Sequence, residues 1–376
     1  MNLWRSIKKR FGRKVESSYC ISNLYKTGYS RKVFISYLVS PFREDNHFKH
    51  QNYLTSHIVA EAFSELGYNV DVYDYQAKVE IPYDTYDVIF GIGDNFERSF
   101  YSNNRLIPRI HLVTGTHQNL HNQNGLKSIK DFFEVSGIWL NDETNIMQDN
   151  HYYAMHEADV ALLMAEGFVL ENFRSAFKNK LYTLNNNILG VFSGFAVKDK
   201  PTRNFLFLSG GKQLTKGLTL ILEAARLRKD VNFYVVVPKL NSVLESYYAD
   251  VIEQENVFLF KDLSMNSVEM KRIVETCSYV IAPSYVDGLP GGTIEPMSAG
   301  LIPIVSKFCG FAQKEFIFEI EELTVPGVLR AIEDTMTKTE GKYMELSKQV
   351  RTYAAESYSK EAVKERLKYI LKNELG

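Results

Sequence analysis

The chain has 376 residues, of which 45% are hydrophobic and 24% charged, so it is long enough for two domains of ordinary size and too balanced to be disordered. Its formal net charge of −1 and its pI near 6.7 argue against a nucleic-acid-binding surface that covers the whole protein. Three scattered cysteines, Cys20, Cys277 and Cys309, exclude a disulfide framework and fit a reducing compartment.

The first fourteen residues form a basic amphipathic segment that is rich in lysine and arginine. Its large apolar residues recur every three or four positions, as on one face of a helix: Leu3, Trp4, Ile7 and Phe11. Such a helix can lie in the interface of an anionic membrane, or it can dock its apolar stripe on the protein itself. Because the first predicted strand begins only near Lys32, we assign residues 1–31 to an extension outside the fold.

The expected location of the protein depends on this segment and on what the chain lacks. No apolar run approaches the about 20 residues that a membrane-spanning helix needs, and the start lacks the hydrophobic region of a signal peptide. We therefore expect a cytoplasmic protein that can lie peripherally on the inner face of the cell membrane through residues 1–14.

The first half of the chain alternates apolar runs with helical periods. Strands are expected at 32–39, 69–73, 87–90, 109–113 and 159–164. A helix around 54–66, which Gly67 ends, separates the first two strands and completes a βαβ unit. We predict a Rossmann-like N-terminal domain over residues 32–195.

Two polar loops in this half follow predicted strands. His117 comes just after the strand at 109–113, at the edge where open α/β sheets bind ligands, and its imidazole could hydrogen-bond a hydroxyl group. The alternative is an ordinary polar loop residue. His50 and Asn52 follow the first strand and face the same edge. The histidines of the chain are too scattered for a metal site, and none is expected.

Residues 197–202 are predicted to link the two halves of the chain. In the second half, strands are expected at 205–209, 232–237, 257–260, 279–282 and 302–306. We predict a second Rossmann-like domain over residues 203–352. A separate C-terminal helix is expected over 353–376, within a tail that is helical from Met344 to Leu375.

A glycine turn with two lysines follows the predicted strand at 205–209. The turn contains Gly210, Gly211, Lys212 and Lys216, and leucines at helical spacing come after it. Strand, glycine turn, lysine and helix form an anion-binding layout, so Lys216 could direct its ammonium group at phosphates. The alternative is that this lysine is only a solvated charge at a helix start.

The most informative segment, residues 284–306, carries Asp287 and Glu295 on either side of a glycine-rich turn. The turn follows a predicted strand and leads into a short helix, where open α/β sheets bind ligands. Because glycine has no side chain, the backbone N–H groups of the turn can approach a diphosphate. The two carboxylates can accept hydrogen bonds from the hydroxyls of a sugar and a ribose. The alternative is a turn whose glycines serve only packing.

This segment resembles the donor-site signature of the retaining glycosyltransferases of family 4, in which Gly-x-Pro separates two acidic residues and a glycine and a proline then open the next strand. The resemblance is clearest over residues 205–306. It implies an α/β protein with the GT-B fold, in which two Rossmann-like domains face a central cleft. The chain departs from the signature at Asp287, where glutamate is usual, at Gly211, where arginine is usual, and in one extra residue before Pro303.

The resemblance also implies an activity and roles for single residues. The protein would move a hexose from a nucleoside diphosphate sugar to a hydroxyl acceptor with retention of anomeric configuration. The implied donor-binding residues are Gly210, Gly211, Lys212, Lys216, Asp287, Gly288, Leu289, Pro290, Gly291, Gly292, Thr293 and Glu295. The implied catalytic residues are His117, Lys216 and Asp287, and the implied acceptor-side residues are His50 and Asn52. Within these sets, Asp287 would contact the sugar, Lys216 the diphosphate and Glu295 the ribose.

Further expectations follow from the same resemblance. No metal is required, because Lys216 and the N–H groups of the turn take the place of Mg²⁺. A UDP-sugar is favoured over a GDP-sugar as donor, and the basic start favours a lipid-linked or cell-envelope glycan as acceptor, as in polysaccharide biosynthesis. No nucleic acid is expected as a partner, and the last helix would cross back to the acceptor-side domain.

Two alternatives to a glycosyltransferase stay open. One is a GT-B nucleotide-sugar epimerase or phosphorylase, and the other is a non-catalytic sugar-nucleotide-binding partner of another transferase. A dehydrogenase is disfavoured, because the Gly91-Ile-Gly93 stretch lacks the third glycine of a dinucleotide-binding turn.

Overall fold

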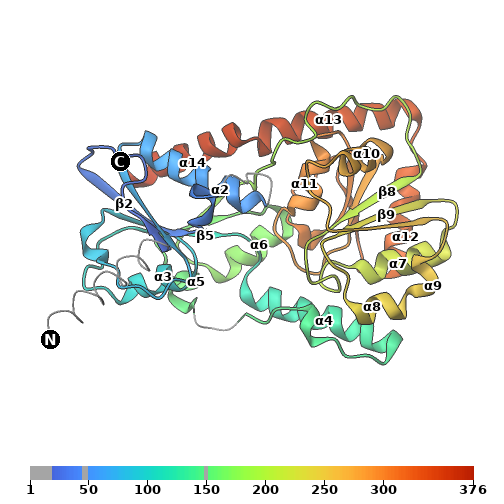
Figure 1. The fold of residues 1–376 in the computed structure, drawn as a ribbon, viewed down its shortest axis with the longest axis horizontal. Coiled ribbons are helices and arrows are strands. Elements are labelled where there is room, and N and C mark those ends of the chain that lie inside the picture. Colours follow the sequence, from blue (N-terminus) through green and yellow to red (C-terminus); the bar gives the residue numbers. More distant parts are fainter. Residues whose placement is uncertain (1–18, 45–49, 148–150) are drawn as a thin grey trace, which may run out of the picture.

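The computed structural model describes residues 19–44, 50–147 and 151–376. These residues form two α/β units that lie side by side along the longest axis of the molecule, with the N-terminal unit on the left of Figure 1. The amphipathic segment 1–14 lies outside the described residues, so both of its interpretations stay predictions.

The first unit is built on a sheet that, within the described residues, has seven strands in the order β1-β3-β2-β4-β5-β6-β7. The strands are β1 (Cys20–Ile21), β2 (Arg31–Tyr37), β3 (Tyr68–Asp74), β4 (Val88–Gly91), β5 (Arg109–Val113), β6 (Val160–Leu163) and β7 (Lys180–Thr183). The helices between these strands are α2 (Gln51–Glu65), α3 (Gly93–Arg98), α4 (Gln118–Ser136), α5 (Tyr152–Glu157) and α6 (Gly167–Ala176). Of these, α4 lies beneath the second unit in Figure 1, and its Ile129 and Phe132 belong to the core of that unit. β1 pairs with β3 in antiparallel orientation, and the other neighbouring strands are parallel.

The N-terminal edge of this unit differs from the prediction. Residues 20–21, which the sequence assigned to the extension 1–31, pair with β3. The Leu24 N–H group also donates to the Val70 carbonyl at 2.8 Å. A strand of two residues has no periodicity of its own, so the sequence pattern could not reveal it.

The second unit has six parallel strands within the described chain, in the order β10-β9-β8-β11-β12-β13. The strands are β8 (Asn204–Leu208), β9 (Asn232–Val237), β10 (Val257–Lys261), β11 (Tyr279–Ala282), β12 (Ile302–Ser306) and β13 (Phe318–Ile320). The helices are α7 (Leu218–Leu227), α8 (Ser242–Tyr247), α9 (Ala249–Ile252), α10 (Val268–Thr276), α11 (Gly291–Met297) and α12 (Val325–Met336). The structure contains all the strands that were predicted for this half of the chain. It also contains the short edge strand β13, which the sequence pattern did not predict.

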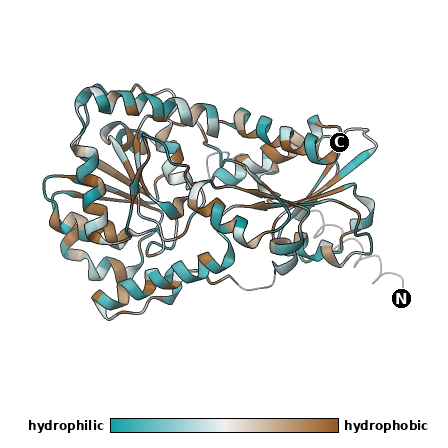
Figure 2. Cartoon of the chain, turned by 180° about the vertical axis from the view of Figure 1, so that it is seen from behind, coloured by the Kyte–Doolittle hydropathy of each residue, from teal (hydrophilic) through white to brown (hydrophobic). Residues whose placement is uncertain are grey.

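Hydrophobic residues are concentrated on the strands of both sheets (Figure 2), and their side chains form the cores together with apolar residues of the helices. In the first unit, successive residues of β2 alternate between two cores, with Phe34 on one face of the sheet and Val33 and Ile35 on the other. Burial on both faces explains why this strand reads as a continuous apolar run. No helix of the described residues is both long and apolar enough to cross a bilayer.

Two helices at the end of the chain, α13 (Glu340–Tyr358) and α14 (Lys360–Leu375), run across both units (Figure 1). The apolar residues of α13 belong to the core of the second unit, and those of α14 to a core of the first. Ser359 separates the helices and caps α14, because its hydroxyl accepts the Ala362 N–H at 3.3 Å. Lys360 and Lys364 of α14 form ion pairs with Glu61 of α2 at 2.7 and 3.3 Å.

We predict that Leu367→Ala lowers the free energy of unfolding by about 2–5 kcal/mol, because Leu367 is fully buried between α14 and the first unit. Chemical denaturation measures this loss. The control is Tyr369→Ala on the same helix, where the side chain is 58% exposed, and the change should stay within about 0.5 kcal/mol. Equal effects of the two substitutions would mean that α14 does not pack into this core.

Candidate functional site

A cavity of about 500 Å³ lies between the two units, where strands of both sheets end. We call it the loop cavity, because the glycine turn after β11 forms part of its wall. From the first unit it is lined by His50, Gln51, Asn52, Thr114 and Met164, and from the segment that connects the units by Asn186 and Leu189. From the second unit it is lined by residues 207–211, 236–238 and 262–263, and by Lys216, Met265, Ala282, Ser284, Asp287, Gly288 and residues 290–293. The structure therefore brings most of the predicted donor-binding residues into one cavity.

The glycine turn makes close backbone contacts. A Cβ atom on Gly292 would lie 2.1 Å from the Leu208 carbonyl oxygen of β8, and one on Gly288 would lie 2.9 Å from the Gly115 Cα atom of the first unit. Both positions therefore need glycine for packing as well as for ligand approach. Gly291 and Gly292 begin α11, so their N–H groups have no acceptor within the helix, and both residues line the loop cavity.

An ion pair lies beside this turn. The Lys216 ammonium is 2.5 Å from Asp287 Oδ2, and the two side chains are 26% and 15% exposed. Lys216 also donates to the Val286 carbonyl at 3.2 Å, while Asp287 Oδ1 accepts the Gly288 N–H at 3.1 Å. The sequence placed Lys216 and Asp287 at separate parts of a ligand, and the structure shows that they contact each other.

The turn after β8 directs only one of its two lysines to the loop cavity. Gly217 has a positive φ of 80°, and a Cβ atom there would lie 2.1 Å from the Pro283 carbonyl oxygen, which fixes this turn against the end of β11. Gly210 and Gly211 line the cavity together with Lys216. Lys212 instead donates to the Asp142 carbonyl of the first unit. The structure thus does not place the Lys212 ammonium at the predicted phosphate site.

Glu295 is the predicted site residue that differs most from expectation. It is fully buried and does not line the loop cavity. Its two carboxylate oxygens accept the N–H groups of Leu189 and Val191, in the segment that connects the units, at 2.5 and 3.0 Å. Successive side chains of a helix rotate by roughly 100°, so Glu295 points about 200° away from Thr293, which does line the cavity. The eight-residue spacing of the two carboxylates could not reveal this rotation.

Leu289, another predicted donor-binding residue, is also fully buried. Its N–H group donates to the Cys309 carbonyl, and its carbonyl oxygen accepts from the Asn186 side chain at 2.9 Å. Its backbone has a positive φ of 42°. The residue therefore shapes the turn from within, and its side chain does not face a ligand.

His117 caps helix α4 and does not line the loop cavity. Its Nδ1 atom accepts the Asn119 N–H at 3.3 Å, and the rings of His156 and Phe173 lie against it. Burial lowers the pKa of His117, which favours the neutral imidazole that can accept this bond. The structure thus does not bring His117 to the predicted catalytic position. His121, one turn further along α4, lines a cavity instead.

A second cavity of about 510 Å³, which we call the histidine cavity, lies at the same sheet edge. Its lining includes Tyr75, Gly93, Thr116, Gln118, Asn145, Met147 and Met155, as well as His111, His121 and His151. Burial lowers the pKa of His111 to about 4, so its imidazole is neutral near pH 7. Within the described part of the chain, His111 Nδ1 and Thr116 Oγ1 are buried without a hydrogen-bond partner. Both atoms are out of contact with solvent, so they lie behind the surface of the cavity wall.

The two cavities meet at the ion pair. The residues common to both linings are Thr114, Gly211, Lys216, Asp287 and Gly288. A molecule in one cavity can therefore reach a molecule in the other. His50 and Asn52, which were predicted on the acceptor side, line the loop cavity and not the histidine cavity. Most of the residues that line the histidine cavity were not predicted as site residues, although many of them follow the carboxyl ends of β3, β4 and β5, where ligands are expected.

No group of three or more His, Cys, Asp or Glu residues within 19–44, 50–147 and 151–376 could hold a metal ion. The charged groups at the junction of the cavities are one lysine and one aspartate.

A known family matches one part of the chain, and known structures match nearly all of it. Residues 194–319, which contain both glycine turns and Asp287, match the family described as Glycosyl transferases group 1. This match supports glycosyl transfer as the reaction class. None of the curated proteins matches the chain.

Three solved structures share the fold over nearly the whole chain. Sucrose-phosphate synthase from Thermosynechococcus elongatus has a TM-score of 0.62 at 12% identity, and the match covers 91% of this chain and 99% of that one. Anabaena HepE, solved in complex with UDP and glucose, has a TM-score of 0.57 at 11% identity, and the match covers 91% of this chain and 99% of that one. WaaG, a glycosyltransferase involved in lipopolysaccharide biosynthesis, has a TM-score of 0.55 at 13% identity, and the match covers 90% of this chain and 98% of that one. The predicted GT-B fold is confirmed.

We predict that Glu295→Gln flattens the pH dependence of stability. Burial raises the pKa of Glu295 from 4.5 to about 7 in the folded protein, so the folded state favours the protonated form. Protonated Glu295 therefore contributes up to about 3 kcal/mol to the free energy of unfolding. The contribution is fully present below pH 4.5 and is lost as the pH rises through 7. Glutamine does not titrate, so the unfolding temperature of the wild type should fall more between pH 5 and 7.5 than that of the variant.

Thermal unfolding of both proteins in the same buffers measures this difference. All other ionisable groups are the same in both proteins, so their contribution cancels in the comparison. Parallel curves for the two proteins would show that Glu295 keeps an ordinary pKa and is not held in this buried position.

Proposed function

We propose that the protein is a retaining hexosyltransferase, similar to those of family 4, that uses a nucleoside diphosphate sugar as donor and a glycan hydroxyl as acceptor. The observation that carries this proposal is the junction of two cavities of similar size at Lys216, Asp287 and Gly288. A binding module for sugar nucleotides needs only one such cavity. Two cavities that meet at a charged pair suit a transfer between two bound molecules.

The donor would lie in the loop cavity. Lys216 and the N–H groups of Gly291 and Gly292 supply positive charge and hydrogen-bond donors for a diphosphate. The nucleoside would extend toward an apolar wall that contains Val237, Pro238, Leu263 and Met265. We retain UDP as the favoured nucleotide, and the similar fold of HepE, which was solved with UDP and glucose, supports this choice.

The acceptor would lie in the histidine cavity, whose lining includes the polar residues Gln118, His121 and Asn145. These groups suit a polyhydroxylated molecule, since each hydroxyl can donate and accept a hydrogen bond. A lipid-linked or cell-envelope glycan remains the proposed class. The similar fold of WaaG, which is involved in lipopolysaccharide biosynthesis, is consistent with this class.

The proposed reaction needs no protein nucleophile. The bond between the anomeric carbon and the diphosphate breaks, the acceptor oxygen bonds to that carbon on the same face, and the acceptor proton passes to the departing phosphate. Lys216 and the turn N–H groups stabilise the charge that grows on this phosphate, which is the role of a metal ion in other transferases. In this proposal, Asp287 orients the hydroxyls of the transferred sugar.

Lys216→Ala should weaken UDP binding by about 1.5–3 kcal/mol, roughly ten- to hundredfold, because hydrogen bonds to charged groups have this strength. Titration calorimetry with UDP measures the loss, and EDTA should not change it. Lys212→Ala is the matched control, since its ammonium binds the Asp142 carbonyl. Equal losses in both variants, or binding that requires Mg²⁺ or Mn²⁺, would contradict the proposed diphosphate site.

We also propose that residues 1–14 bind anionic membranes. Co-sedimentation with vesicles of anionic phospholipid should decrease as salt is added, because the attraction is electrostatic. A chain that begins at Ser17 should no longer sediment and should still bind UDP. Equal sedimentation of the two chains would refute the membrane role of the segment.

A further inference from the structure

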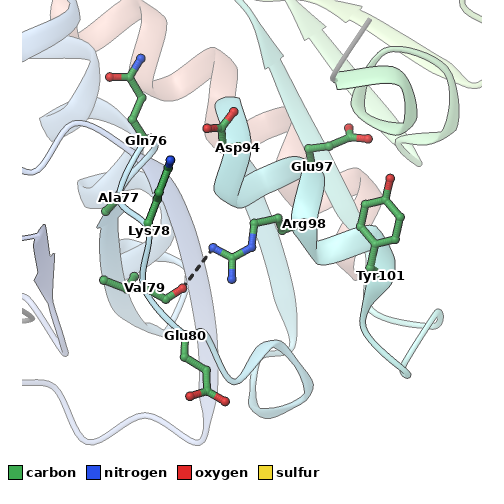
Figure 3. A pocket seen from close by; sticks show the side chains of 9 residues that line it. All are labelled: Gln76, Ala77, Lys78, Val79, Glu80, Asp94, Glu97, Arg98 and Tyr101. Carbon is green, nitrogen blue, oxygen red and sulfur yellow. Dashed lines mark hydrogen bonds between the residues drawn. The ribbon is translucent and has the colours of Figure 1, made fainter.

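A third hollow, of about 650 Å³, lies on the first unit beside the histidine cavity (Figure 3). We call it the outer pocket. It is lined by Gln76, Ala77, Lys78, Val79, Glu80, Asp94, Glu97, Arg98 and Tyr101. These residues belong to the segment after β3, to α3 and to the turn that follows α3, and the proposed transfer reaction uses none of them.

The outer pocket adjoins the histidine cavity. Tyr75 and Gly93 line the histidine cavity, and the next residues in the chain, Gln76 and Asp94, line the outer pocket. Gly93 allows the two segments to touch, since a Cβ atom there would lie 2.5 Å from the Tyr75 ring. Asp94 Oδ1 also lies 2.8 Å from His151 Nε2 of the histidine cavity. The two hollows therefore follow one another along the same edge of the sheet.

The walls of the outer pocket are fixed to each other. Arg98 extends between the two segments, as Figure 3 shows, and its Nη1 group donates to the Val79 carbonyl at 3.1 Å and to Asn95 Oδ1 at 3.2 Å. The Asn95 N–H group donates to the Tyr75 carbonyl at 3.2 Å. A pocket held in this way is largely formed before a ligand arrives, which lowers the entropic cost of binding.

The chemistry of the lining favours a neutral, polyhydroxylated ligand. The charged groups that can face a ligand are the cations Lys78 and Arg98 and the carboxylates Glu80 and Asp94. The Glu97 carboxylate is buried and accepts the N–H groups of Tyr153 and Ala154. These two cations and two carboxylates balance, so the lining has no net charge to attract a nucleic acid or a polyphosphate, whereas sugar hydroxyls can bond to groups of both signs. Tyr101 is 67% exposed at the rim, so its ring can cover the apolar face of a sugar.

We propose that the outer pocket is a distal subsite for an oligosaccharide acceptor, whose reactive hydroxyl lies in the histidine cavity while its next sugar residues occupy the outer pocket. This inference rests on the proposed function and narrows the acceptor to a chain of several sugars. A monosaccharide or a small alcohol would leave the outer pocket empty.

Saturation-transfer NMR on the full chain with UDP present tests this subsite. The probes are linear oligosaccharides of glucose, galactose, mannose and N-acetylglucosamine with one to six residues. For at least one series, the signal should increase with chain length. Tyr101→Ala and Lys78→Ala should each remove this increase and leave the signal of the shortest bound member unchanged. Tyr369→Ala, which alters a tyrosine exposed to 58% on α14, is the control and should have no effect.

Several outcomes separate this proposal from the proposed function. A signal that does not depend on chain length in any series, or a length dependence that survives both pocket substitutions, would overturn the distal subsite. Length-dependent binding in a chain that fails to bind UDP would support the subsite and refute the transferase. Arg98 is left unchanged in these experiments, because its bond to Val79 holds the pocket wall.

Discussion

The contact between the glycine turn of the second unit and the strand ends of the first is the constraint on which the cleft depends. Gly288 lies against the backbone of Thr114, Gly115 and Met164, where a side chain would not fit without movement. This approach sets the separation of the two sheets and joins the two cavities at Lys216 and Asp287. A Cβ atom at position 288 would lie 2.9 Å from the Gly115 Cα atom, so a larger residue there requires the turn or the first unit to shift.

Polar side chains around the segment that connects the units reinforce this geometry. Asn187 accepts a hydrogen bond from Thr55 of α2 at 2.7 Å, and Asn186 donates to the carbonyl of Leu289 in the glycine turn. Glu295 of α11 binds two further N–H groups of the same segment. Because buried polar groups are costly when unpaired, these bonds hold α2 and α11 in one relative position. Both helices begin at the loop cavity, so the arrangement fixes the cavity wall.

Much of the fold could be predicted because its central strands are buried on both faces and therefore appear as apolar runs. The short edge strands β1, β7 and β13 have no such signal. Lys216 and Asp287 could be predicted as site residues, but their contact spans 71 positions and depends on tertiary structure. Glu295 and His117 were expected to face ligands, whereas helix rotation and capping direct them elsewhere. The histidine cavity was missed because its residues come from several strand ends that are distant in the chain.

The most direct test of the account is the product formed from a panel of UDP-sugars and oligosaccharide acceptors, followed by proton NMR of the anomeric signals. The account predicts that UDP is released only when an acceptor is present, and that the new glycosidic bond has the anomeric configuration of the donor. Consumption of the donor without an acceptor would instead indicate an epimerase or a hydrolase. In the proposed reaction, the acceptor attacks the anomeric carbon on the face from which the diphosphate leaves. A product of inverted configuration would contradict this reaction.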